Sequence, residues 1–177
     1  ETGISIMKIV EELDAGPVMK SIKISIKKYT TYQSLSQEMS NLSSFLILEC
    51  LEIIDNKEEK FIPQNHSKAT YAKKIEKAET KINWNDKAKK IIAKINGLYP
   101  RPGCWFELNG SRIIVLEAKE IKATGKPGEI INDHFTIACS ENAIQIVQLK
   151  KEGKSDMSAT SFLTGNKLKI GSNLNDA

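Results

Sequence analysis

Apolar and polar residues alternate in two stretches near the start of the chain, at residues 3–7 and 18–26. A period of two is typical of β-strands with one buried face, so this pattern predicts two strands. Lys20 is the one residue of the second stretch that stands out of place on the apolar face. Gly16 and Pro17, between the two stretches, predict a tight turn that joins the strands.

Asp14 belongs to this turn, and its side chain has two interpretations. Turns held by a rigid sheet often carry the working groups of a protein, so Asp14 is a candidate catalytic carboxylate. The alternative is a turn-forming aspartate whose side chain hydrogen-bonds its own backbone. The spacing of the residues leaves both interpretations open.

Residues 31–55 follow helical spacing, and Thr30 with Gln33 forms a capping-box signal at the start of the predicted helix. Glu49 interrupts the apolar stripe of this helix. Two strands and one helix cannot bury a core by themselves, because each apolar face must pack against a second layer. We expect the missing layer upstream, and the chain, which starts with Glu1 rather than Met, to be a fragment of a longer protein.

The middle of the chain, residues 56–70, shows no periodicity and is rich in polar residues, which predicts a linker. The basic segment 71–84 continues this linker and is expected to run along the surface. A second helix is predicted to be capped by Asn85 or Asp86 and to end at residue 97. Its apolar stripe covers one face, and its lysines lie on the other faces.

From Cys104 onward the hydrophobic period changes to two, with turn signals between short apolar runs. The pattern predicts five short strands, at residues 104–108, 112–121, 128–131, 135–139 and 143–149. A last short helix is predicted at residues 158–163, and the tail from Lys167 is expected to fray or to close the edge of a barrel. Five short strands with a basic surface predict a small barrel of the oligonucleotide-binding type.

The composition is that of a soluble globular protein, because 40% of the 177 residues are hydrophobic and 27% are charged. No apolar run is long enough to cross a bilayer, and the start is neither a signal peptide nor a transit sequence. Cys50, Cys104 and Cys139 are too widely spaced for a metal or redox motif, so reduced, buried thiols are expected. His66 and His134 have no neighbouring ligand at a suitable spacing, and no metal site is predicted.

Charge is distributed unevenly along the chain. Residues 1–60 hold seven lysines against ten acidic residues, whereas residues 61–177 hold nineteen basic residues against twelve acidic ones. The two parts are therefore expected to meet different partners. The basic excess of the second part favours a polyanion as partner, with a lysine-rich solvated surface as the alternative.

Four stretches of the sequence together resemble a known family. IMKIVEELDAGPVM resembles the end of the catalytic domain of formyltransferases that use 10-formyltetrahydrofolate. YAKKIEKAETKINW, INGLYPRPGCWFELNG and QLKKEGKSDMSATSFLTG are similar to the linker and C-terminal domain of the methionyl-tRNA formyltransferases in particular. The resemblance covers nearly the whole chain and implies transfer of a formyl group from 10-formyltetrahydrofolate to the amino group of methionine on initiator tRNA.

The resemblance also implies roles for the turn. The family uses an Asn, a His and an Asp around the formyl carbonyl, without a metal or a covalent intermediate, and Asp14 matches its Asp. The Asn, the His and the family's Ser-Leu-Leu-Pro signature have no match in this chain, so we expect the chain alone to be inactive. The resemblance implies that the loop lining the folate pterin, largely through main-chain groups, consists of Val10, Glu11, Glu12, Leu13 and Asp14. We do not expect this half-pocket to bind folate usefully by itself.

For tRNA, the resemblance implies contacts from the linker and the barrel, through phosphate neutralisation that weakens as salt rises. The candidates in and just after the linker are Lys68, Lys73, Lys74, Lys77 and Lys81. Weaker candidates are Lys87, Lys90, Arg101, Arg112, Lys150, Lys151 and Lys154. For each of them, a solvated surface side chain is the alternative. Trp84 and Trp105 are expected to anchor the barrel core rather than to stack on bases.

Taken together, the sequence predicts an α/β part, a partial Rossmann-like formyltransferase domain, followed by a small β-barrel domain with an OB-fold-like architecture. The expected parts are the end of the catalytic domain at residues 1–60, a basic linker at 61–82 and a tRNA-binding domain at 83–177. The protein is expected to be a cytoplasmic, bacterial monomer without membrane contact, with initiator methionyl-tRNA as partner. Two alternatives stay open: a non-catalytic nucleic-acid-binding module, and a formyltransferase with a small-molecule acceptor.

Overall fold

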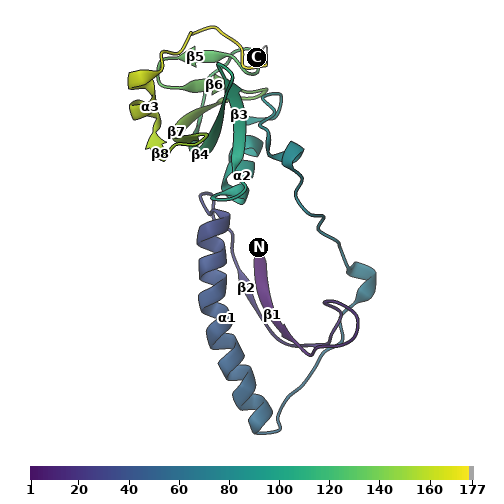
Figure 1. The fold of residues 1–177 in the computed structure, drawn as a ribbon. Coiled ribbons are helices and arrows are strands. Elements are labelled where there is room, and N and C mark those ends of the chain that lie inside the picture. The colour runs from purple at the N-terminus through teal and green to yellow at the C-terminus, as the bar shows by residue number, and fades with distance from the viewer. Residues whose placement is uncertain (176–177) are drawn as a thin grey trace. The chain divides into compact units, whose positions relative to one another are not determined.

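The computed structural model describes residues 1–175, and the chain divides into two compact units (Figure 1). Unit 1 covers Glu1–Lys74 and unit 2 begins at Ile75. Unit 1 consists of β1 (Thr2–Met7), β2 (Val18–Ile24), α1 (Tyr32–Asp55) and a 3₁₀ turn (His66–Lys68). Unit 2 consists of a 3₁₀ turn (Lys77–Thr80), α2 (Ala88–Leu98), β3 (Cys104–Leu108), β4 (Ser111–Ile121), β5 (Ile130–Asn132), β6 (Thr136–Ala138), β7 (Ala143–Lys151), β8 (Asp156–Ser158) and α3 (Ala159–Gly165).

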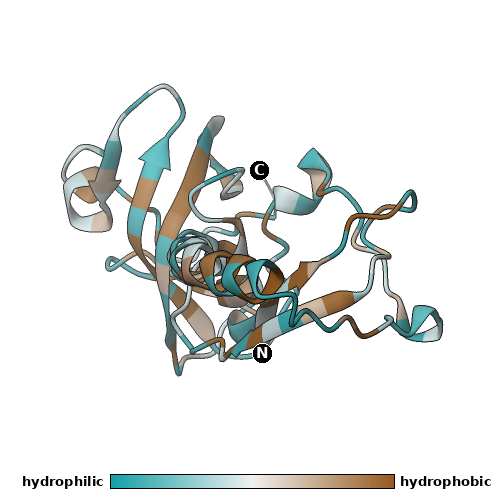
Figure 2. Cartoon of the chain, turned by 90° about the horizontal axis from the view of Figure 1, so that it is seen from below, coloured by the Kyte–Doolittle hydropathy of each residue, from teal (hydrophilic) through white to brown (hydrophobic). Residues whose placement is uncertain are grey.

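Unit 1 is a two-stranded antiparallel sheet with one helix packed against it. β1 pairs with β2 in a register that sets Ile4 opposite Ile22, and α1 contacts both strands. The two strands and the long helix predicted from hydrophobic periodicity are therefore confirmed. Only Ile24, Leu46 and Cys50 are fully buried apolar side chains of this unit in the described range. Hydrophobic residues recur around α1, which is seen nearly end-on in Figure 2, and many of them remain exposed.

Lys20 and Glu49, the two polar residues that interrupt the apolar patterns of β2 and α1, form an ion pair with each other. Lys20 lies on the half-buried side of its strand and reaches the carboxylate of Glu49 on the helix. A charged side chain on an inward face loses hydration, and an opposite charge beside it offsets part of that loss. The two charged residues that interrupt the apolar patterns are thus explained by one contact between the strand and the helix.

The start of α1 lies one residue later than the capping-box signal predicts. Thr31 is the N-cap: its hydroxyl accepts a hydrogen bond from the Ser34 amide at 3.1 Å, and the Ser34 hydroxyl accepts one from the Thr31 amide. Thr30, the predicted cap, instead accepts a bond from the amide of Lys27 at 2.9 Å. Its hydroxyl is used by the preceding turn, so the prediction of a Thr30 and Gln33 capping box is wrong.

Unit 2 is built on a curled antiparallel sheet with the strand order β3-β4-β7-β6-β5, and β8 pairs with β7 beside this path. Chain segments cover both ends of the sheet. At β3, the Ile82 amide donates to the Trp105 carbonyl at 2.8 Å. At β5, the Ile130 amide donates to the Ser172 carbonyl at 2.9 Å, and the Gly171 amide donates to the Ile130 carbonyl. The tail therefore does not fray at residues 171–172 but pairs with the edge strand β5, which is the second possibility predicted for it. The backbone groups at this edge of the sheet are thereby covered.

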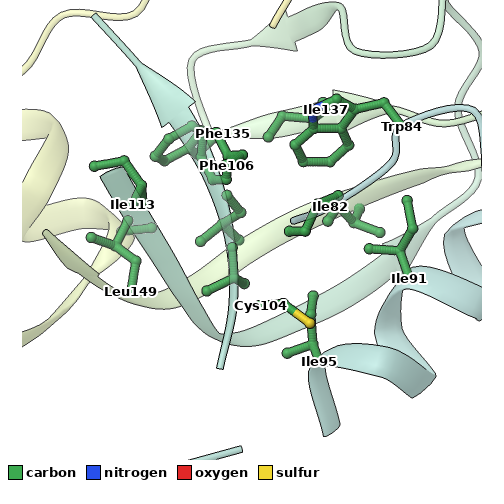
Figure 3. Close-up of a cluster of buried hydrophobic side chains, with 14 of the residues drawn as sticks. Ile82, Trp84, Ile91, Ile95, Cys104, Phe106, Ile113, Phe135, Ile137 and Leu149 are labelled. Carbon is green, nitrogen blue, oxygen red and sulfur yellow. The ribbon is translucent and has the colours of Figure 1, made fainter. Parts of the chain in front are cut away.

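A row of aromatic rings runs through the core of unit 2 (Figure 3). Trp84 meets Phe106 edge to face with 5.5 Å between ring centroids, Phe106 meets Phe135 at 6.1 Å, and Phe135 stacks on Phe162 at 5.7 Å. Trp84 is 2% exposed, so its predicted role in the core is confirmed. Trp105 alternates with Phe106 along β3 and lies half-buried on the opposite face, so the same prediction for Trp105 is wrong.

Two further details of unit 2 differ from the sequence predictions. The N-cap of α2 is Lys87, with no side-chain cap, rather than Asn85 or Asp86. The Ala88 amide donates instead to the carbonyl of Glu141 in a neighbouring turn at 3.0 Å, so a tertiary contact replaces the local cap. β8 was not predicted either, because Met157 is its one apolar residue and no alternation is visible.

The three cysteines are free and buried, as predicted. Burial raises the pKa of the Cys104 thiol and of the Cys139 thiol from 9.0 to about 11. Both histidines are exposed, also as predicted. Within residues 1–175, no helix combines the length and the apolar character needed to span a membrane.

Candidate functional site

The loop that joins β1 to β2, residues 8–17, is the first candidate site, and its ends are held together at a narrow neck. The Lys8 amide donates to the Pro17 carbonyl at 3.0 Å. Gly16 is buried in this neck, where a Cβ atom would lie 1.7 Å from the Lys8 carbonyl oxygen. Only glycine permits such a close approach of two backbone segments, so the sequence position of Gly16 is explained by the neck.

Asp14 belongs to this loop and has a left-handed backbone conformation, with a φ of 57°. Aspartate tolerates this conformation better than most residues with a side chain. Its carboxylate is exposed and forms no hydrogen bond or ion pair with any residue in the range 1–175. The self-bonded turn former predicted by the alternative interpretation is therefore not observed, and the carboxylate is free for solvent or a ligand.

The backbone of the loop is equally accessible. No amide N–H from Val10 to Leu13 donates to another described protein atom, and the Leu13 side chain is 89% exposed. A cleft of about 750 Å³ is lined on one side by Glu12 to Ala15 and on the other by residues 64–66 and 68–71. Unpaired main-chain donors beside a cleft are the groups that a ligand with ring nitrogens and a carbonyl would bind.

Gln64 contacts the loop, although no pattern in the sequence predicts this contact. Its side-chain amide donates to the Asp14 carbonyl at 2.8 Å and to the Gly16 carbonyl at 2.7 Å. The residues of this contact are 50 and 48 positions apart, and no motif or periodicity links them. The only signal in the sequence is the neighbouring Pro63, which breaks any regular element there.

The predicted tRNA-facing side chains fall into two groups. Lys81, Lys87, Lys90 and Lys150 form ion pairs with acidic neighbours, among them Lys87 with Glu141 at 2.6 Å. The Glu141 carboxylate, through a hydrogen bond and its charge, raises the pKa of Lys87. The exposed candidates without an ion pair to residues 1–175 are Lys68, Lys73, Lys74, Lys77, Arg101 and Lys154, and Lys151 and Arg112 are half-buried without such a pair.

Arg112 and Lys81 gather at the ring of Trp105 on the outer side of β3. The Arg112 guanidinium lies 4.3 Å and the Lys81 ammonium 5.3 Å from the ring centroid. The ring is fixed because its Nε1 donates to the Thr80 hydroxyl at 3.0 Å. The two cations are held in place by one indole ring, whereas the lysines of the linker are separate exposed side chains.

Comparison with known families gives a match to one family model. The model of the formyl transferase C-terminal domain matches residues 74–167, more than half of the chain. The chain belongs to this family. The matched part of the formyl transferase C-terminal domain includes the whole sheet and all three aromatic contacts of the core.

Curated relatives extend the similarity to unit 1. The chain is 40% identical over 175 residues to the methionyl-tRNA formyltransferase of Pelagibacter ubique and 38% identical to that of Bradyrhizobium diazoefficiens. These matches cover 98% and 97% of this chain but 56% of each relative. The formyl transferase C-terminal domain and the segment before it thus span about half the length of the curated relatives they match.

Solved structures show the same fold. HypX from Aquifex aeolicus, described in complex with tetrahydrofolic acid, matches 96% of this chain and 33% of its own with a TM-score of 0.71 and 19% identity. The N-formyltransferase from Helicobacter canadensis, described with folinic acid and dTDP-3-aminofucose, matches 81% of the chain with a TM-score of 0.60 and 14% identity. At such identities the likeness extends to the fold alone.

Proposed function

We propose that this chain is the C-terminal part of a methionyl-tRNA formyltransferase, which transfers a formyl group from 10-formyltetrahydrofolate to the amino group of methionine on initiator tRNA. The supporting observation is the 40% identity to an enzyme of that name along 98% of the chain. Because the chain spans 56% of that relative, the activity belongs to a complete enzyme that also contains the remaining part.

In this proposal Asp14 handles a proton of the acceptor. The attacking amine loses a proton as its nitrogen bonds to the formyl carbon, and a positioned carboxylate accepts that proton directly or through one water. The Asp14 carboxylate has no protein partner in residues 1–175, so it is available for this task. The Asn and His of the family's catalytic set would come from the part of the enzyme that this chain does not cover.

The loop before Asp14 fits a folate donor chemically. A pterin ring presents a carbonyl oxygen and ring nitrogens, and the free amides of Val10 to Leu13 are donors for such acceptors. Exposed Glu11 and Glu12 add acceptors for ring N–H groups. The donor supplies the formyl group, while the loop residues bind and orient its ring.

The basic side chains without ion pairs are proposed to neutralise tRNA phosphates. Lys68, Lys73 and Lys74 follow one another along the exposed segment after Gln64, and Lys77 and Arg101 continue the basic character in unit 2. Contacts of this kind give affinity without reading the base sequence. The paired side chains of Lys87 and Lys90 would first have to leave their acidic partners, so they rank below the unpaired ones.

The finer architecture belongs to the same proposal. Unit 1 is proposed to be the end of a Rossmann-like catalytic domain, and the curled sheet of unit 2 an OB-fold-like barrel that serves tRNA binding. The complete enzyme is proposed to act in the bacterial cytoplasm as a monomer.

Formylation of charged initiator tRNA by the complete enzyme tests the catalytic proposal. Asp14→Asn removes the proton acceptor, and we expect kcat to fall by about 10²–10⁴-fold while tRNA binding persists. The matched control is Asp55→Asn, at the exposed end of α1, which should leave turnover unchanged. Wild-type turnover in the Asp14 variant would refute the role of Asp14 in catalysis.

Binding of initiator tRNA at two salt concentrations tests the nucleic-acid part. Lys73→Glu with Lys74→Glu should weaken binding and reduce the slope of log affinity against log salt by about two. Lys27→Glu with Lys28→Glu is the matched control, because it reverses an adjacent exposed pair elsewhere in unit 1. An equal loss in both double variants would indicate a general charge effect and not a tRNA contact.

The same assays separate the alternative functions. A wild-type enzyme that binds tRNA without formylating it would favour a non-catalytic nucleic-acid-binding module. Formylation of a nucleotide-linked amino sugar in preference to tRNA would favour the small-molecule acceptor, the chemistry named for the Helicobacter canadensis protein. The basic segment with its unpaired lysines favours tRNA over a small-molecule acceptor, because a small acceptor needs no extended cationic surface.

A further inference from the structure

The loop around Asp14 has few contacts with the rest of unit 1 apart from its neck. Ile9 and Leu13 are each 89% exposed, so neither side chain anchors the loop by packing. The neck itself, formed by Lys8, Gly16 and Pro17, fixes where the loop begins and ends. The peptide that follows Asp14 has one further backbone contact, a long hydrogen bond of 3.5 Å from the Ala15 amide to the Glu12 carbonyl.

The segment after α1 returns to this loop in an ordered way. The Val18 amide donates to the Ile62 carbonyl and the Ile62 amide donates to the Val18 carbonyl, both at 2.8 Å. Gln64 lies two residues beyond Ile62, and its side chain reaches the loop. The bridge at Val18 thereby sets the distance between Gln64 and the loop.

Gln64 then bonds the loop twice with one group. Its Nε2 donates to the carbonyl of Asp14 at 2.8 Å and to that of Gly16 at 2.7 Å. A side-chain amide nitrogen has two hydrogens, so both are used. Among residues 1–175, Gln64 is the only residue whose side chain hydrogen-bonds the backbone of the loop.

We propose that Gln64 is a positioning residue, which holds the Asp14 carboxylate in its working orientation by clamping the carbonyls of Asp14 and Gly16. The inference rests on the proposed function. The clamp stabilises the left-handed backbone of Asp14, which determines the direction of its side chain. Misplacement of a catalytic group by about 1 Å is enough to lower a rate by about a hundredfold.

The clamp also connects two parts of the proposed enzyme. Gln64 is followed directly by the segment that contains Lys68, Lys73 and Lys74. The residue that holds the catalytic loop therefore lies directly before the exposed segment whose lysines are proposed to bind tRNA. Residues 64–66 and 68–71 line the same cleft as Asp14, so the clamp also positions one wall of that cleft.

The test is Gln64→Glu in the complete enzyme. The carboxylate keeps the length of the side chain, lacks both N–H donors and is repelled by the two carbonyl oxygens. We expect kcat to fall by about ten- to a hundredfold, with the KM for tRNA changed less than twofold. Hydrogen exchange of the Lys8 and Ala15 amides, the amides of the loop that are hydrogen-bonded to backbone carbonyls in the described residues, should accelerate, while exchange in α1 stays the same. Gln33→Glu, an exposed glutamine of α1, is the matched control and should change neither quantity.

A merely structural role would give a different result. Faster exchange throughout β1, β2 and α1, together with a kcat loss that stabilising conditions reverse, would show that Gln64 only supports the fold of unit 1. Unchanged kcat and unchanged loop exchange would also overturn the proposal. If Gln64→Glu does not fold, Gln64→Met replaces it, because methionine has a similar length and no donor, and the same two measurements decide.

The outcome is distinguishable from failure of the proposed function. If the wild-type enzyme formylates neither tRNA nor an amino sugar, the enzyme assignment fails. Exchange of the Lys8 and Ala15 amides in the Gln64 variants would in that case still report whether the clamp stabilises the loop. If the wild type is active and Gln64→Glu is equally active, the function stands and the clamp alone is refuted.

Discussion

Unit 1 and unit 2 both combine an antiparallel sheet with helical structure, but they differ in how many apolar side chains they bury. Unit 2 surrounds twenty buried residues with a curled sheet, two helices and two covering chain segments. In unit 1, one helix covers one side of two strands, and Phe45, Leu48 and Leu51 of that helix are all more than half exposed. A helix that is apolar on several faces needs neighbours on each of them. The comparison shows that regular elements form from local pattern, whereas a closed core needs a second layer.

The curated relatives are longer than this chain, which covers 56% of each of the two compared above. The exposed apolar face of α1 is therefore expected to be covered in a complete enzyme. Unit 2 matches its family model by itself and needs no such cover. The following predictions examine this difference, beginning with the largest effect.

Separation of the two units should give the clearest contrast. A segment that begins at Ile75 is expected to unfold in one cooperative transition, because its core closes within itself. The segment Glu1–Lys74 is expected to show no cooperative transition, because its few buried residues cannot offset the loss of chain entropy. Circular dichroism during urea unfolding measures both. A cooperative transition in the first segment would break the comparison.

Equivalent truncations in the two units should differ by several kcal/mol. Phe106 is 1% exposed in unit 2 and Phe45 is 71% exposed in unit 1. Phe106→Ala should lower the free energy of unfolding by about 3–5 kcal/mol, because it empties the centre of the aromatic row. Phe45→Ala should change it by less than about 0.5 kcal/mol in this chain. Chemical denaturation gives both values, and a much larger loss for Phe45→Ala in the complete enzyme would show that Phe45 is covered there.

Alanine at two glycines should have opposite effects. Gly16→Ala puts a Cβ atom against the Lys8 carbonyl and should destabilise unit 1 by about 1–3 kcal/mol, with faster exchange of the Lys8 amide. Gly97, near the end of α2, has no atom within 4 Å of an added Cβ. Gly97→Ala should stabilise unit 2 by about 0.5–1 kcal/mol, because alanine loses less backbone entropy in a helix. Slow exchange at Lys8 in Gly16→Ala would contradict the tight neck.

Alkaline pH should lower the free energy of unfolding of unit 2 because its buried thiols resist ionisation, with no effect at neutral pH. The pKa values of Cys104 and Cys139 are about 11 in the folded protein, against an ordinary value of 9.0. As pH rises from 9 to 11, the unfolded chain loses these protons first, so the free energy of unfolding falls. The double variant Cys104→Ala with Cys139→Ala should show a flatter decline across this window. Equal slopes in urea titrations of parent and variant would refute the burial effect.

The elements of both units could be predicted because hydrophobic period is a local property. β1, β2 and α1 follow their apolar positions, and the predicted strands of unit 2 reappear with small shifts at their ends. β8 was not predicted because its single apolar residue, Met157, does not establish a period. Trp105 was predicted in the core from its apolar character, yet alternation along β3 gives the inward place to Phe106.

The candidate site was predictable only in part. Resemblance to a family selected Asp14 and the residues before it, and the structure leaves the Asp14 carboxylate without a protein partner in the described range. The Gln64 clamp could not be predicted, because its donor and acceptors are 50 and 48 residues apart. The cations at the Trp105 ring were equally invisible, since Lys81 and Arg112 approach the ring only after strand pairing.

By itself, the sequence determined the order and type of the elements apart from β8, the burial of the cysteines and the family resemblance, since each follows from neighbouring residues or from a continuous motif. The tertiary structure alone decided which polar residues meet. Lys20 pairs with Glu49 from 29 positions away, Ala88 is capped by the carbonyl of Glu141, and Gln64 holds the backbone of Asp14. The physical reason is that hydrogen bonds and ion pairs need atoms within about 3–4 Å, and only the folded chain brings such distant residues together.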